Sequence, residues 1–317
     1  MVRFVVAVDA CGGDLGPAAV VEGAVWAKKE CPRLEIVLSG PEGELAGLLD
    51  RHGFRDKVSV VHAPDVISPS ESPTIAFRRK KESSMVVGLK LVKEGKAQAF
   101  VSAGSTGALL TGATVLVGRQ KGIERPALAT LLPNAKKGFT LLVDSGANMD
   151  SKPNYLLQFA ELGSEYMKNF KGMKSPRVGL INVGAEDEKG NNLVKEAFHL
   201  LKGSGLNFVG NIEGREIPSG DLDVVVCDGF TGNVILKFME GTAKSMMGMI
   251  KEELLSSPVS KLGALLAKGA FKKIRKRFDY REVGGAPFLG LKAMVIKAHG
   301  SSDALAIKNA ILQTVKE

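Results

Sequence analysis

The chain has 317 residues, of which 44% are hydrophobic and 24% are charged, and its formal net charge is +9. This composition is typical of a folded protein and excludes intrinsic disorder. Three cysteines without a CxxC pair argue against a disulfide framework and a zinc site, and they indicate a reducing compartment. The N-terminus lacks the apolar core of a signal peptide, and no apolar run approaches the ~18 residues of a membrane span.

Short apolar segments alternate with amphipathic stretches along the chain, a pattern that predicts strands joined through helices. The predicted strands are residues 4–9, 35–40, 58–64, 97–104, 127–133, 139–146, 177–184, 206–213, 222–229 and 293–300. Strands that are apolar along their whole length predict a mainly parallel sheet covered by helices on both faces. No repeat or linker divides the sequence, so we expect a single α/β domain over residues 1–317.

One region departs from this alternation. A helical pattern runs from Val234 to Phe278 and is interrupted near Pro258, which predicts a helical hairpin that protrudes from the sheet. The second arm, residues 261–278, carries seven basic residues and no acidic one. This local charge indicates an anionic partner. Each arm also has an apolar face, which could pack against the other arm or against a second subunit.

The first loop, CGGDLG, invites comparison with nucleotide-binding motifs. A dinucleotide fingerprint requires glycine where Cys11 stands, and it requires an acid where the second predicted strand ends on Ser39 and Gly40. No GxxxxGK[ST] motif occurs. These mismatches argue against a nicotinamide site, and the missing motif rules out a P-loop. A tight turn without a ligand remains an alternative for this loop taken alone.

Polar and glycine-rich loops follow several predicted strands, and the carboxyl ends of parallel strands are where α/β sheets place their sites. The loop at residues 102–107 should also offer free backbone N–H groups to an anion at the start of a helix. Together these loops predict a polar crevice for a small oxyanion, although Ser, Thr and Asn cap helices in most proteins. The candidate site residues are Asp9, Gly12, Gly13, Asp14, Ser102, Gly104, Ser105, Thr106, Gly107, Asn182, Lys189, Asn191, Asp228, Asn233 and His299.

Covalent catalysis is not indicated by the sequence. There is no GxSxG motif, and none of the four histidines has a recognisable triad spacing. Cys11 and Cys227 are more simply read as buried thiols than as nucleophiles.

Seven motifs carry a resemblance to a known family: DACGGDLGP, VSAGSTGALLTGA, LLVDSGAN, INVGAEDEKGN, VVVCDGFTGNVILK, GGAPFLG and KAHGSSDALAIKNAI. Their order over nearly the whole chain resembles the bacterial phosphate acyltransferases of phospholipid synthesis, the PlsX family. Cys11, Ser105 and Ser145 replace the methionine, asparagine and valine that are usual there, which puts the role of Ser105 in doubt. The resemblance implies a homodimeric three-layer α/β/α fold, similar to isocitrate and isopropylmalate dehydrogenases.

The activity implied by this resemblance is transfer of a fatty acyl group from acyl carrier protein to inorganic phosphate. The acyl phosphate product would serve glycerol-3-phosphate acylation, and the enzyme would work in the cytoplasm against the inner face of the membrane. Phosphate is already nucleophilic near neutral pH and a thiolate leaves readily, so positioning and oxyanion stabilisation should dominate. No cofactor is expected.

Roles within the crevice follow from charge. We assign phosphate binding to the Gly12–Gly13 and Ser102–Gly107 loops together with Lys189. The amides that could orient carbonyl or phosphate oxygens are Asn182, Asn191 and Asn233. The carboxylates, which repel phosphate and could orient the lysine, bind a metal or cap loops, are Asp9, Asp14, Asp144 and Asp228.

The hairpin is the expected contact surface for acyl carrier protein, anionic lipid and the downstream membrane acyltransferase. The residues assigned to it are Val259, Leu262, Leu265, Lys268, Lys272, Lys273 and Lys276. An acyl- or acetyl-coenzyme A:phosphate transferase is the alternative enzyme, and a metal-dependent decarboxylating dehydrogenase could share the fold. RNA binding through residues 261–278 is the alternative without catalysis. No nucleic acid is expected, because the aromatic residues there are only Phe271 and Phe278.

Overall fold

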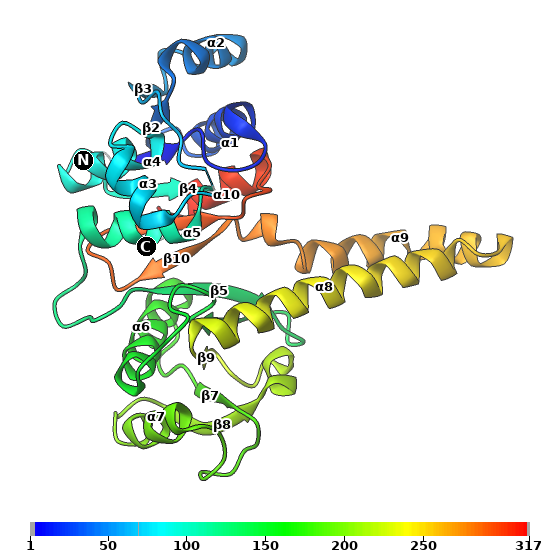
Figure 1. Ribbon diagram of the computed structural model, residues 1–317. Helices are drawn as coiled ribbons and strands as arrows, with labels where there is room; N and C mark the ends of the chain where they lie inside the picture. Colours follow the sequence, from blue (N-terminus) through cyan, green and yellow to red (C-terminus); the bar gives the residue numbers. More distant parts are fainter. Residues whose placement is uncertain (1–3, 69, 316–317) are drawn as a thin grey trace.

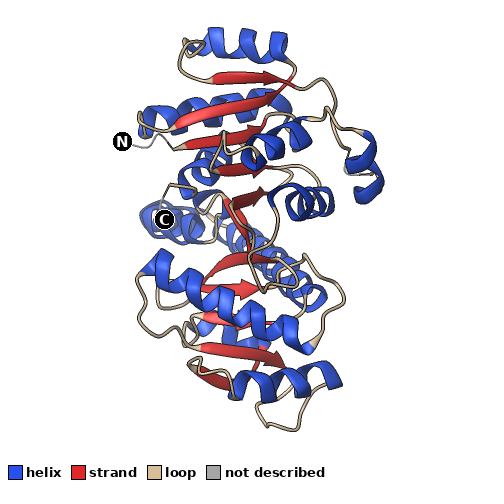
Figure 2. Ribbon diagram, turned by 90° about the vertical axis from the view of Figure 1, so that its left-hand side faces the viewer, coloured by secondary structure: helices blue, strands red, loops and turns tan. Residues whose placement is uncertain are grey.

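A computed structural model describes residues 4–68 and 70–315 (Figure 1). Within these residues eleven strands form one sheet in the order β3-β2-β1-β4-β11-β10-β5-β6-β9-β7-β8. The strands are β1 (Val5–Asp9), β2 (Glu35–Gly40), β3 (Ser59–His62), β4 (Ala99–Ser102), β5 (Ala127–Pro133), β6 (Phe139–Val143), β7 (Val178–Asn182), β8 (Phe208–Glu213), β9 (Val224–Val226), β10 (Gly285–Leu289) and β11 (Met294–Ala298). Figure 2 shows helices on both faces of this sheet, which confirms the predicted three-layer α/β/α fold.

The helices follow the predicted alternation with the strands. They are α1 (Gly16–Glu30), α2 (Glu42–His52), α3 (Pro73–Arg79), α4 (Ser84–Lys93), α5 (Thr106–Gly112), α6 (Pro153–Lys171), α7 (Asn192–Lys202), α8 (Gly229–Leu254), α9 (Pro258–Arg277) and α10 (Ala304–Gln313). Buried apolar side chains on α6, including Leu156 and Phe159, pack in one core cluster with strands β6, β7 and β9. Burial of such side chains stabilises each by about 1.5–3 kcal/mol relative to exposure.

The sheet has two parallel parts joined by two antiparallel strands. We call β3, β2, β1, β4 and β11 the N-terminal half, and β6, β9, β7 and β8 the C-terminal half; neighbours within each half are parallel. Between them, β11–β10, β10–β5 and β5–β6 are all antiparallel. Three successive reversals mean that strands of the two halves run in opposite directions. The sequence pattern predicted that the carboxyl ends of the strands meet at one edge of the sheet. In the structure they meet at one edge within each half, but not across the two halves.

The sequence pattern missed one strand, β10. Its segment GAPFL contains Pro287, and proline lacks the N–H that a central strand donates to its ladder. In the structure β10 pairs with β11 through residues 285–287 and with β5 through residues 288–289. Pro287 falls where the strand passes from one partner to the other, so the missing donor is tolerated.

The predicted helical hairpin is present. Helices α8 and α9 lie side by side and project away from the sheet (Figure 1). Pro258 occupies the first turn of α9, where proline is favoured, and the hydroxyl of Ser257 accepts a hydrogen bond from the backbone N–H of Ser260. None of the described residues of α9 is buried within this chain. Over the described residues, no helix is both long and apolar enough to cross a membrane.

Candidate functional site

A cleft of about 360 Å³ lies where the two halves meet. Its N-terminal side carries Thr106, Lys297 and His299, which follow or end strands β4 and β11. Asn233 of α8 faces the same space from the C-terminal half. The remaining lining residues are Leu128, Thr130, Leu131, Ser145, Gly146, Leu236, Lys237, Glu240, Tyr280, Val283, Gly284, Gly285, Ala286 and Ala298. The cleft thus combines polar groups with an apolar wall.

Lys297 is the partly buried cation of this cleft. It pairs in register with Ser102 of the neighbouring strand β4. Its ammonium donates hydrogen bonds to the backbone carbonyls of Ala103, at 3.3 Å, and of Ala298. Burial lowers the pKa of Lys297 to about 8, and the nearby charges of Asp9 and Asp14 oppose that shift. Lys297 is not among the site residues predicted from the sequence, although a lysine near the end of the apolar segment AMVIKAHG was a usable signal.

Asp9 organises the loops beside Lys297. Its carboxylate is 2% exposed and accepts hydrogen bonds from the Ser102 hydroxyl at 2.6 Å and from the Gly12 and Cys11 amides at 3.1 and 3.2 Å. The Gly104 amide in turn donates to the Ser102 hydroxyl at 3.0 Å. Burial raises the pKa of Asp9, and these hydrogen bonds act in the opposite direction.

The glycine loops were expected to present free amides to phosphate, and the structure corrects this for two of them. The amides of Gly12 and Gly104 already donate within the Asp9 network. A Cβ on Gly104 would lie 2.7 Å from the Met85 Cε atom, and one on Gly107 would lie 2.8 Å from the Pro73 ring. These glycines therefore allow the chain to pack closely against itself.

The neighbouring positions of these loops are arranged similarly. Gly13 has a φ of +95°, and a Cβ there would lie 2.9 Å from the Gly300 carbonyl oxygen. That carbonyl accepts a hydrogen bond of 2.7 Å from the backbone N–H of Asp14, whose side chain is exposed. Ser105 precedes α5 without capping it through its side chain. Of this group of predicted phosphate residues, Thr106 is the one that lines the cleft.

The rim of the cleft contains a small aromatic and hydroxyl network. The Nδ1 atom of His299 is 2.8 Å from the Ser301 hydroxyl, which also lies 3.1 Å from the Tyr280 hydroxyl. The rings of Tyr280 and His299 are 5.3 Å apart. His299 is exposed, so its imidazole is accessible to a ligand at the mouth of the cleft.

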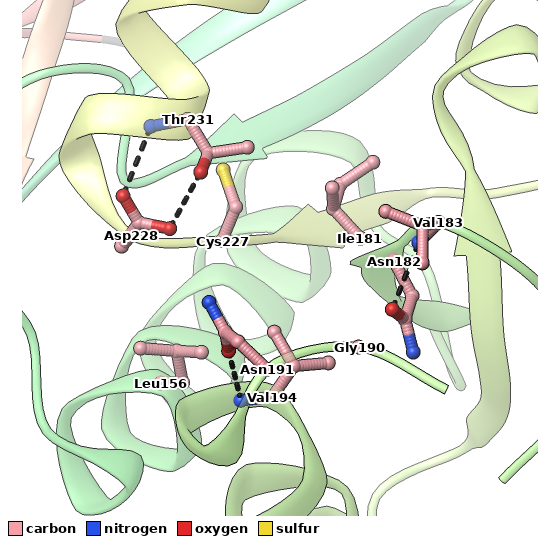
Figure 3. A pocket seen from close by; sticks show the side chains of 10 residues that line it. All are labelled: Leu156, Ile181, Asn182, Val183, Gly190, Asn191, Val194, Cys227, Asp228 and Thr231. Carbon is pink, nitrogen blue, oxygen red and sulfur yellow. Dashed lines mark hydrogen bonds between the residues drawn. The ribbon is translucent and has the colours of Figure 1, made fainter. Parts of the chain in front are cut away.

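A second, smaller pocket lies in the C-terminal half. It has a volume of about 160 Å³ and is lined by three of the predicted catalytic residues, Asn182, Asn191 and Asp228 (Figure 3). Asn191 accepts a hydrogen bond of 3.0 Å from the Val194 amide at the start of α7. Asp228 accepts hydrogen bonds of 2.9 and 2.6 Å from the amide and hydroxyl of Thr231 at the start of α8. Both side chains act as helix N-caps.

Asn182 fixes the loop that carries Lys189. The Asn182 side chain donates a hydrogen bond of 3.0 Å to the Lys189 carbonyl and accepts one of 2.8 Å from the Val183 amide. The Lys189 side chain itself is exposed and lines neither of these two cavities. Because β7 lies five strand positions from β11, the separation along the sheet is roughly 24 Å at about 4.8 Å per strand. The structure therefore does not bring Lys189 to the glycine loops.

Asp144 is the counterpart of Asp9 in the C-terminal half. This fully buried carboxylate accepts hydrogen bonds from the Asn148 side chain at 2.8 Å and from four backbone amides, those of Leu128, Gly146, Ala147 and Asn148. Its role is to hold the turn after β6. Throughout the described part of the chain, no three His, Cys, Asp or Glu side chains come together in a way that could hold a metal ion.

Fold and site together define a class: an α/β protein with a cleft between the two halves of one sheet, in which polar groups, including a partly buried lysine, face an apolar wall. The fold is similar to a phosphotransacetylase from Streptococcus pyogenes, with a TM-score of 0.66, 18% identity and coverage of 99% of this chain and 95% of that one. It is also similar to a putative 4-hydroxythreonine-4-phosphate dehydrogenase from Salmonella typhimurium, with a TM-score of 0.56, 13% identity and coverage of 100% and 99%. At these identities the likeness concerns the fold alone.

Sequence comparison specifies the family. Residues 4–316 match the family model described as "Fatty acid synthesis protein". A phosphate acyltransferase from Clostridium botulinum (strain Loch Maree / Type A3) is 53% identical over 311 residues, which cover 98% of this chain and 92% of that protein. One from Clostridium acetobutylicum is 51% identical over 313 residues, covering 98% and 94%. The chain belongs to this family, the PlsX-type phosphate acyltransferases, as the motifs predicted.

Proposed function

We propose that this protein transfers a fatty acyl group from acyl carrier protein to inorganic phosphate and so makes acyl phosphate for phospholipid synthesis. One observation carries the proposal: 98% of the chain matches proteins named phosphate acyltransferase at 53% identity. The chain is thus an acyltransferase of lipid synthesis. The cleft supports the choice of substrates, because phosphate is an anion and an acyl thioester is largely apolar.

In the proposed reaction a phosphate oxygen attacks the thioester carbonyl carbon, the C–S bond breaks, and the carrier thiolate leaves. The dianion needs no base, so the protein must hold it about 3–3.5 Å from the carbon and stabilise the oxyanion. Thr106 and Asn233 face the cleft from opposite halves and could donate hydrogen bonds to these oxygens. His299 at the rim could donate to the departing sulfur.

The apolar wall suits the first carbons of the acyl chain. Leu128 and Leu131 of β5 are 7% and 6% exposed, and they line the cleft together with Leu236 of α8. Val283, just before β10, and Ala286, within β10, line the same cleft. Contact with such side chains would be favourable by about 0.8 kcal/mol for each methylene removed from water.

As a secondary proposal, the residues predicted from the sequence at the C-terminal pocket take part in catalysis. Asn182, Asn191, Asp228 and Lys189 would act in catalysis only if the acyl or phosphate group reached this smaller cavity. Their hydrogen bonds to the loop and the helix ends support a structural role instead.

The hairpin is proposed as the surface for carrier protein, membrane and a second subunit. Near its tip Val259, Leu262 and Leu265 are 81%, 61% and 65% exposed, which suits shallow insertion into lipid. The basic residues Lys268, Lys272, Lys273 and Lys276 follow on the same helix and suit an acidic protein or anionic headgroups. Phe238 and Met246 leave an apolar stretch of α8 exposed, which supports a homodimer through this region.

The proposal is tested by incubating the pure protein with acyl-acyl carrier protein and inorganic phosphate, and by following acyl phosphate with ³¹P NMR. Turnover that requires both substrates is the expected result. A parallel reaction with acyl-coenzyme A tests the alternative enzyme, and turnover there without carrier protein would replace the proposal. Salt-sensitive RNA binding with no acyl transfer in either reaction would favour the alternative of an RNA-binding protein.

A further inference from the structure

The cleft holds a cation that is not among the site residues predicted from the sequence. Lys297 is the next-to-last residue of strand β11 and lies beside Ser102 of β4, and it lines the cleft together with Thr106 and His299. We propose that Lys297 is the catalytic cation that binds inorganic phosphate in this cleft and stabilises the charge that develops during acyl transfer. This assignment rests on the proposed function, because it names the group that would hold its second substrate.

The hydrogen bonds of Lys297 position its ammonium without neutralising it. An ammonium group has three N–H donors. Two are used by the carbonyls of Ala103 and Ala298, which leaves a third for a ligand in the cleft. Both acceptors are uncharged, and none of the ion pairs among the described residues involves Lys297. The positive charge therefore remains available to an anion.

The surrounding charges favour the protonated form of Lys297 without removing its attraction for phosphate. Asp9 is the last residue of β1 and its charge acts on Lys297, but its carboxylate is committed to the Ser102 hydroxyl and to two backbone amides. Asp14, on the surface nearby, also favours the ammonium form. The other titratable groups that face the cleft are Lys237, Glu240, Tyr280 and His299.

Burial makes this lysine a stronger anion site than an exposed one. Attraction between opposite charges increases as water is excluded, whereas exposed charges are screened within about 10 Å at moderate salt. Burial also lowers the pKa of Lys297 to about 8, so the ammonium form still predominates at neutral pH. Lys189, by contrast, has an exposed side chain on its loop, where water screens its charge.

The test compares Lys297→Met and Lys297→Arg with the control Lys292→Met. Lys292 is an exposed lysine just before the first residue of β11. We expect Lys297→Met to lower kcat/KM for phosphate by about 10²-fold, the scale of one positioned electrostatic group. The KM for acyl-acyl carrier protein should change little. Lys297→Arg should restore part of the activity, and Lys292→Met should match the wild type. Equal phosphate dependence in folded Lys297→Met and wild type would overturn the assignment.

The pH profile separates a cation from a base. If the Lys297 charge binds phosphate, kcat/KM for phosphate falls as pH rises through about 8, where this lysine loses its proton. Lys297→Arg should lose that falling limb, because a guanidinium stays charged. A wild-type rate that instead rises through pH 8 would mean that the neutral amine acts as a base, and the proposal would fail. This measurement on the wild type also serves if Lys297→Met does not fold.

Calorimetric titration with inorganic phosphate distinguishes the proposed phosphate site at Lys297 from the proposed function. Wild-type binding that disappears in Lys297→Met, without acyl phosphate formation, would retain the site and reject the proposed function. Normal acyl phosphate formation by Lys297→Met would retain the function and reject the site.

Discussion

The two halves of the sheet end their strands on the same kinds of residue, yet those residues do different things. In the N-terminal half, Asp9 and Ser102 order the loops beside the partly buried Lys297 at a cleft of about 360 Å³. In the C-terminal half, Asn191 and Asp228 satisfy the first amides of α7 and α8. A polar residue after a strand is thus equally consistent with a site and with a cap. A partly buried cation that lines a cleft is what separates the two halves.

The strongest expected effect concerns the buried carboxylate of the C-terminal half. Asp144→Ala should lower the free energy of unfolding by about 4 kcal/mol, because four backbone amides and the Asn148 side chain lose their acceptor in a buried site. Urea denaturation measures this loss. Asp14→Ala, at an exposed position, should stay within about 0.5 kcal/mol of the wild type. A small effect of Asp144→Ala would mean that the turn reorganises and that the two halves are less alike than Asp9 and Asp144 indicate.

The next effect concerns the hairpin. Glutamate substitutions at Lys272, Lys273 and Lys276 should weaken binding to anionic vesicles or to acyl carrier protein by about 10²-fold, since each cation contributes about 1 kcal/mol at a charged surface. Sedimentation with vesicles and titration with carrier protein measure the two affinities. The matched control reverses Lys93, Lys121 and Lys152, three exposed lysines outside the hairpin. If both triple variants bind both partners like the wild type, the hairpin serves only packing or dimerisation.

Lys189 provides the direct comparison with Lys297. The sequence interpretation predicts a loss of about 10²-fold in acyl phosphate formation for Lys189→Ala, the scale of a positioned charge. The Lys189 side chain is exposed and water screens its charge, so we expect the loss of acyl phosphate formation to be less than about 10-fold. Steady-state kinetics at several phosphate concentrations decide between the two values. The larger loss in a folded protein would move the phosphate site toward the C-terminal pocket.

A smaller effect tests the caps. Asp228→Ala should destabilise the protein by about 1 kcal/mol, as expected for loss of an N-cap, and Asp228→Asn should recover most of that stability. Thermal unfolding measures both variants, and activity is assayed in parallel. Full stability combined with a large loss of turnover in Asp228→Asn would show that the carboxylate takes part in the reaction.

A further effect is a pH dependence with a defined sign. The pKa of Lys297 is lowered from about 10.5 to about 8 by burial, so between these values the unfolded chain binds more protons than the native one. Stability contributed by this group therefore rises with pH through that window. The difference in unfolding free energy between wild type and Lys297→Met should shift in favour of the wild type from pH 7 to pH 10. A shift in the opposite direction would contradict the burial of the ammonium.

The sequence alone determined the layered α/β architecture, the interruption of the hairpin at Pro258 and the family. Apolar runs define strands locally, proline limits helices locally, and motif order is a property of the chain itself. The possibility that Asn191 and Asp228 are caps was also visible, because capping depends on residues only a few positions apart.

Tertiary structure decided what depends on distant contacts. Strand β10, with Pro287, exists because β11 and β5 both pair with it, and no local pattern encodes that pairing. The three antiparallel pairings around β10 and β5 reverse the strand direction, which separates the Lys189 loop from the glycine loops. The burial of Lys297 likewise arises only where the loops after β1 and β4 close over the end of β11, because desolvation is a property of the assembled surroundings and not of the residue type.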